Sequence, residues 1–92
     1  MAVTLLIPTA LRAFTDRKSS VEVSAENVGE AIIALTQEYP AIKKHLYDDT
    51  GKLREYVNLF IGDTNIKDRD GLQTPLKDAD EVMLVPAIAG GK

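Results

Sequence analysis

Residues 81–86, EVMLVP, decide how the chain can fold. The run is apolar and contains two valines, so it predicts a strand, and the proline that closes it has no amide hydrogen for further pairing. Val82 and Leu84 fall on one face of such a strand, and the residues between and after them fall on the other. This late strand can pair in parallel with the first strand of the chain, which would place it at the middle of a sheet.

Two short apolar runs at residues 3–7 and 21–24 predict the first two strands. We expect a long hairpin loop over residues 9–19, because these residues are small or polar and the end of this segment suits a turn. Residues 56–61, YVNLFI, give the strongest strand pattern in the chain. After the turn that follows, Ile66 is expected to begin a very short strand.

One segment between these strands has a helical rather than an extended period. Asn27 is a good N-cap, and Glu30 completes the spacing of a capping box. Pro40 is expected to stop the helix, and residues 42–47 could add a short helical turn. The apolar stripe of this helix consists of Val28, Ala31, Ile32, Leu35 and Tyr39.

The order strand, strand, helix, strand, short strand, strand indicates an α+β fold. We expect a ubiquitin-like β-grasp domain over residues 1–86, with a mixed sheet of four to five strands and one main helix across one face. A ferredoxin-like fold is the rival, but it needs a second long helix, and residues 62–80 are too rich in Gly, Asp and Pro to form one. Residues 87–92 are expected to be a flexible Gly-Gly tail.

The composition excludes several classes of function. The chain has 92 residues, no Cys, one His and a net charge of −3. It therefore has no room for a second core, no thiolate chemistry and no His-rich metal site, so we expect no bound metal. The charge argues against a nucleic-acid binder. The first apolar run is too short for a membrane span or a signal peptide, which favours the cytoplasm and no membrane contact.

Gly90 and Gly91 are the strongest candidate functional residues. Glycine has no Cβ, so a Gly-Gly segment can pass through a narrow channel. By itself the pair is typical of a flexible end or a remnant of cloning. Behind a β-grasp pattern, it favours a tail whose carboxylate reaches the active site of another protein.

The chain resembles a known family on residues that run almost from end to end. They are residues 3–4, 7–9, 11–12, 20–21, 28–29, 51–53, 56–58 and 84–91. On these stretches the chain is similar to the ubiquitin-like sulfur-carrier family, which includes the small subunit of molybdopterin synthase and the thiamin-pathway carrier. It most resembles the carriers of thiocarboxylate-dependent cysteine synthesis, and the ending PAxAGG is the most specific part of the match.

The resemblance implies a protein co-substrate rather than an enzyme. An E1-like partner would adenylate the Gly91 carboxylate with ATP, and a sulfur donor would convert the adenylate into a thiocarboxylate. Gly90, Ala89 and Ala87 would be the threading residues. The second partner would be a sulfur-accepting cysteine synthase that holds pyridoxal phosphate, whereas this chain is expected to bind no cofactor.

Lys92 departs from the family pattern, because the reactive glycine should be last. Lys92 is either a natural extension that a protease removes or a remnant of cloning. A metalloprotease that trims Lys92 or releases the product is therefore a third candidate partner.

A second candidate site follows from the period of the strands. If alternate residues of strands 1, 3 and 5 face the helix, the intervening apolar side chains point outward. We expect them to cluster and to bind a partner, unless a loop covers them. The set is Leu6, Phe60, Met83 and Val85. His45, in contrast, is expected to be a surface residue in a polar turn.

Other functions fit the same residues. A ubiquitin-like protein modifier would use the same activated glycine to form a bond with a lysine. A plain β-grasp binding module would not use the tail at all. Among sulfur carriers, supply of sulfur for cysteine, thiamin, molybdopterin or tRNA thiolation stays open.

Overall fold

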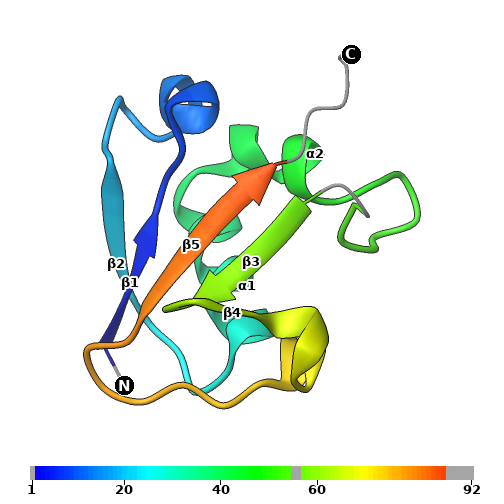
Figure 1. The fold of residues 1–92 in the computed structure, drawn as a ribbon. Helices are drawn as coiled ribbons and strands as arrows, with labels where there is room; N and C mark the ends of the chain where they lie inside the picture. The colour runs from blue at the N-terminus through cyan, green and yellow to red at the C-terminus, as the bar shows by residue number, and fades with distance from the viewer. Residues whose placement is uncertain (1, 55–56, 87–92) are drawn as a thin grey trace.

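The computed structural model describes residues 2–54 and 57–86. Five strands form one sheet in the order β2-β1-β5-β3-β4 (Figure 1). Their bounds are β1 Ala2–Leu6, β2 Ser20–Ser24, β3 Val57–Ile61, β4 Thr64–Asn65 and β5 Glu81–Pro86. The helices are α1 Val28–Glu38 and α2 Lys43–Leu46, and the 3₁₀ turns are η1 Thr9–Phe14, η2 Pro40–Ile42, η3 Ile66–Asp68 and η4 Gly71–Gln73.

The last strand lies at the centre of the sheet, as its sequence predicts. β5 pairs in parallel with β1 and antiparallel with β3, whereas the other pairings are antiparallel. This mixed sheet with one main helix across a single face is the β-grasp arrangement, with α1 behind the sheet in Figure 1. Central placement buries β5 between two neighbours, so its inward side chains Val82 and Leu84 are almost fully buried.

The predicted helix begins and ends where the sequence indicates. The Asn27 side chain accepts a hydrogen bond from the Glu30 amide at 2.8 Å, and the Glu30 carboxylate accepts from the amide of Glu26 at 3.0 Å. The helix ends just before Pro40. Its apolar stripe is confirmed, because Val28, Ala31, Ile32 and Leu35 are buried and Tyr39 packs partly against the same core.

Two expectations about the connecting segments were wrong. The segment expected to be a plain loop contains η1, because Leu11 and Phe14 are three residues apart and both pack on the core. The short fourth strand lies at Thr64–Asn65, whereas Ile66 begins η3 and is 3% exposed. In both segments, burial of an apolar side chain selects a 3₁₀ turn over extended structure.

The N-terminal end of α1 packs closely on η4. A Cβ added to Gly29 would lie 3.2 Å from the carbonyl oxygen of Leu72. The Val28 amide donates to the Thr74 carbonyl at 3.1 Å, so backbone contacts tie the start of the helix to this segment.

In the described part of the chain, no helix has the length and apolar character needed to cross a membrane.

Candidate functional site

Three of the four predicted outward-facing residues form one row across the sheet. Met83 on β5 is the register partner of Leu6 on β1 and of Phe60 on β3. Val85 lies two residues further along β5 on the same face, opposite Asn58. The structure therefore brings together side chains that are far apart in the sequence, as the strand period predicts.

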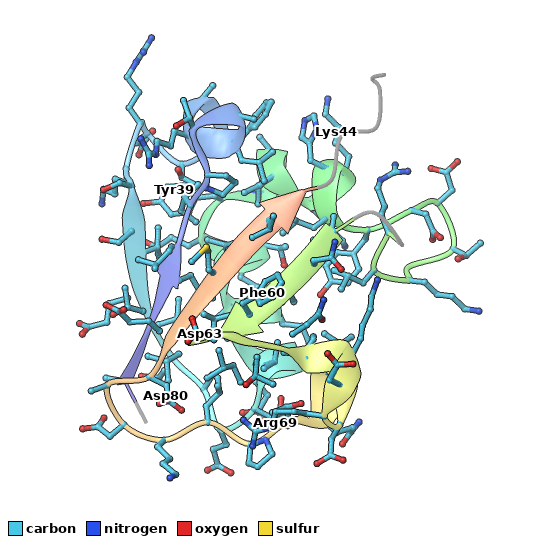
Figure 2. The ribbon with its side chains drawn as sticks, in the orientation of Figure 1. Tyr39, Lys44, Phe60, Asp63, Arg69 and Asp80 are labelled. Carbon is cyan, nitrogen blue, oxygen red and sulfur yellow. The ribbon has the colours of Figure 1, made fainter. Side chains whose placement is uncertain are left out.

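This row is accessible on the face of the sheet that α1 does not cover. Met83 is 43% exposed, whereas Leu6, Phe60 and Val85 are half-buried. Figure 2 shows Phe60 on the near side of the sheet. We give the name apolar row to these three residues together with the adjacent Val85, that is, to the set Leu6, Phe60, Met83 and Val85. Such a contiguous apolar surface that includes an aromatic ring and a methionine is suited to binding another protein.

A hollow of about 760 Å³ opens at one end of the apolar row. It lies between the ends of β1 and β5 on one side and the chain around η1 on the other. Its lining is Leu6, Ile7, Pro8, Ala10, Arg12, Ser19, Ser20, Met83, Leu84 and Val85. The hollow adds polar groups to a surface that the sequence predicts to be purely apolar.

Arg12 is the charged group in this lining. Its Nε donates a hydrogen bond to the carbonyl oxygen of Ile7 at 3.0 Å, which orients the guanidinium beside the end of β1. The Ile7 amide in turn donates to the Ser19 carbonyl at 2.8 Å, which joins two residues of the lining. A fixed guanidinium in an apolar hollow can bind a carboxylate or a carbonyl oxygen of a partner.

Sequence reasoning missed Arg12, Ser19 and Ser20 as members of this site. The segment that carries them was expected to be a loop, and a loop gives no period from which the direction of a side chain can be inferred. The signal that was present is the spacing of Leu11 and Phe14, which is typical of a 3₁₀ turn with both residues on one side.

The tail begins beside this hollow. β5 ends at Pro86, which pairs with Val57, and the preceding Val85 lines the hollow. The predicted reactive Gly91, the predicted threading residues Gly90, Ala89 and Ala87, and Lys92 lie outside the described residues. What the structure supplies for them is the point at which the chain leaves the sheet.

His45 is less exposed than its polar neighbours indicate. Its ring stacks on that of Phe14, with ring centroids 4.1 Å apart and an interplanar angle of 29°. Its Nε2 is buried and has no hydrogen-bond partner among the residues that the structure describes. Within residues 2–54 and 57–86, no group of three or more His, Asp or Glu side chains is placed to hold a metal ion.

Comparison with known proteins gives consistent results. The ThiS family model matches residues 5–91. The sulfur carrier protein CysO of Mycobacterium tuberculosis is 39% identical over 93 residues, covering 99% of this chain and 100% of that protein. CysO in the crystal structure of the Amycolatopsis orientalis BexX/CysO complex is 35% identical, with a TM-score of 0.86 over 97% of this chain and 99% of that one.

A third relative carries a different name. The small archaeal modifier protein 1 (SAMP1) of Methanosarcina acetivorans is 30% identical, with a TM-score of 0.85 over 98% of this chain and 96% of that one. The β-grasp fold agrees with the family match, which extends to Gly91, and the apolar row offers a surface for a partner protein. This chain belongs to the ThiS family of ubiquitin-like sulfur carriers.

Proposed function

We propose that this chain carries sulfur as a thiocarboxylate on Gly91 and delivers it to the synthesis of cysteine. The observation that carries the proposal is the family match, which covers residues 5–91 and therefore ends on Gly91. The apolar row and the hollow supply the surface on which an E1-like enzyme would hold the domain, close to the point where the tail begins.

The chemistry suits a main-chain carboxylate. A carboxylate is a poor acyl donor, so the Gly91 carboxylate first attacks the α-phosphate of ATP and pyrophosphate leaves. Sulfide supplied by a donor then attacks the acyl-adenylate and AMP leaves, which yields the thiocarboxylate. Covalent activation thus divides one difficult step into two easier ones. The chain is a co-substrate in both steps, and the catalytic groups belong to its partner.

The similarity to CysO proteins supports cysteine as the destination of the sulfur. The acceptor would be a cysteine synthase that holds pyridoxal phosphate, in whose site the thiocarboxylate sulfur would bond to the carbon that becomes the cysteine Cβ. An acyl shift from sulfur to nitrogen and proteolysis would then free the thiol and restore the Gly91 carboxylate. Adenylation consumes ATP, which fits action in the cytoplasm. The Gly91 carboxylate exists only after the residue that follows it has been removed, so we assign the removal of Lys92 to a protease, with a metalloprotease as the candidate.

The direct test is a mass measurement. The chain ending at Gly91 is incubated with ATP, its E1-like enzyme and a sulfide source, and the intact protein is weighed. The expected product is heavier by the difference between one sulfur and one oxygen atom. Omission of ATP is the control, and a protein that keeps its mass in the complete mixture contradicts the proposal.

A protein-modifier function is the second candidate, and the similarity to SAMP1 favours it. Both functions need the same activated Gly91, so thiocarboxylate formation does not separate them. Gly-Gly remnants on lysines of other proteins, found by mass spectrometry after proteolysis of cells that contain the chain, would indicate the modifier. Their absence, together with free cysteine formed from the thiocarboxylate by the synthase and the releasing protease, would indicate the carrier.

Phe60→Ala is expected to weaken binding to the E1-like enzyme by roughly 1–3 kcal/mol, because it removes a half-buried aromatic ring from the apolar row. Titration calorimetry measures the change. Ile33→Ala is the matched control, because Ile33 is 51% exposed on α1, away from this face of the sheet. Equal affinities of the Phe60→Ala and Ile33→Ala variants would remove Phe60 from the interface.

A further inference from the structure

Charges are divided unevenly between the two ends of the molecule. At the end where β5 stops, residues 7–19 and 38–54 hold seven Lys and Arg against four Asp and Glu. At the opposite end, residues 24–30 and 61–81 hold three Lys and Arg against eight Asp and Glu. In Figure 2, Lys44 lies near the end of β5, whereas Asp63 and Asp80 lie far from it, toward the end of the molecule where Arg69 is also labelled.

We name six of these seven positive groups at the β5 end the basic collar, which consists of Arg12, Arg17, Lys18, Lys43, Lys44 and Arg54. It lies on both sides of the point where the chain leaves the sheet. Arg12 lines the hollow together with Val85. On the other side, the Arg54 carbonyl accepts from the amide of Val57, which is the register partner of Pro86.

The structure holds the collar in place. The Nε of Arg54 donates to the carbonyl oxygen of Lys44 at 3.0 Å, joining α2 to the segment before β3. The amide of Arg17 donates to the Arg12 carbonyl at 2.7 Å, joining the turn that follows η1 to η1 itself. The two halves of the collar meet where the ring of Phe14 stacks on that of His45. The segments that carry the positive charges are therefore joined to one another by hydrogen bonds and by a ring contact.

Most members of the collar are exposed to solvent. Arg17, Lys18, Lys43 and Lys44 are exposed, and Arg12 and Arg54 are half-buried. A hydrogen bond with Tyr39 and the negative charges of Glu38 and Asp16 raise the pKa of Lys18.

The arrangement has a consequence for encounters with a partner. The whole chain carries a net charge of −3, so an acidic surface repels it on average. In the electric field of an acidic surface the molecule is expected to rotate, because its basic end is attracted and its acidic end is repelled. An acidic surface therefore meets this molecule with the β5 end first, which is the orientation that delivers the tail.

We propose that the basic collar docks on an acidic rim around the entrance of the E1-like partner's active site, and that this pairing sets the rate of association. The proposal rests on the proposed function, because the tail must enter that active site. Charges at the rim of an interface act mainly on the association rate and its salt dependence. The apolar row stabilises the bound complex, and the collar orients the molecule during the encounter.

The test compares two double charge reversals of equal size in the full chain. Lys43→Glu with Lys44→Glu changes the collar, and Arg69→Glu with Lys77→Glu makes the same change of net charge at the acidic end. Stopped-flow association with the E1-like enzyme is measured at low ionic strength. We expect the collar variant to bind roughly 10-fold more slowly, and the control variant to stay within about 2-fold of the parent chain.

The difference is expected to vanish near 1 M salt, where the Debye length falls to about 3 Å. This recovery shows that the variant is folded. Equal association rates of the two variants at low salt would overturn the proposal. The proposal would also be overturned if the collar variant lost binding to duplex DNA while its association with the enzyme stayed unchanged. That result would assign the collar to binding a nucleic acid.

The proposed function is tested separately in the same series. Each double variant, ended at Gly91, is incubated with the complete activating mixture at high salt. Suppose that both variants form thiocarboxylate equally and associate at equal rates at low salt. This result would overturn the proposed role of the collar but not the proposed function. No thiocarboxylate from the parent chain would overturn the proposed function, whatever the association rates.

Discussion

A chain that keeps Lys92 is expected to form no thiocarboxylate on Gly91, whereas the chain ended at Gly91 is converted. In the longer chain the Gly91 carbonyl belongs to a peptide bond, so it offers no oxygen anion to attack ATP. The lysine side chain would also have to occupy a channel that suits residues without a Cβ. We expect the rate of adenylation to fall by roughly 100-fold or more, since the reacting group is misplaced as well as blocked. Release of pyrophosphate measures this rate.

Binding of the longer chain gives the control for this prediction. The apolar row and the basic collar lie within the domain and do not change with Lys92, so affinity for the E1-like enzyme is expected to remain. A chain ended at Gly90 adds a second comparison, because its terminal carboxylate stops one residue short of the reactive position. Adenylation of the Lys92-bearing chain at the rate of the Gly91-ended chain would contradict both the site and the need for trimming.

Leu84→Ala is expected to lower the free energy of unfolding by about 2–5 kcal/mol. Leu84 is 1% exposed on the central strand and lies opposite Leu59, its register partner on β3. Its loss leaves a cavity between the sheet and α1 that neighbouring strands on both sides cannot close. A domain of this size has a total stability of roughly 5–15 kcal/mol, so the variant would lose a large share of it. Guanidinium denaturation measures the change.

Ile33→Ala is again the control, since this side chain is 51% exposed on the solvent face of α1. Its effect on stability is expected to stay within about 0.5 kcal/mol, because little apolar surface is returned to water and alanine favours a helix. A loss below about 1 kcal/mol for Leu84→Ala would mean that the centre of the sheet does not carry the core.

The sequence predicts the regular elements of this protein well because period and punctuation are local. The alternation in residues 81–86 shows which side chains enter the core, and the Asn27 cap and Pro40 place the two ends of α1. The same alternation predicts that Leu6, Phe60 and Met83 share a face, and the register puts them in one row. Prediction fails at residues 9–19 and around Ile66, where short 3₁₀ turns depend on burial against distant residues.

By itself the sequence determines the β-grasp fold and singles out Gly91, because a strand pattern and a glycine pair are properties of neighbouring residues. Only the tertiary structure decides what surrounds the start of the tail. Arg12, Lys44 and Arg54 lie in three separate segments without a period of their own, so nothing local relates their directions. The parallel pairing of β1 with β5 and the stacking of Phe14 on His45 bring these segments to one end of the sheet. A charged end therefore exists only in the folded chain, since charges act through space rather than along the sequence.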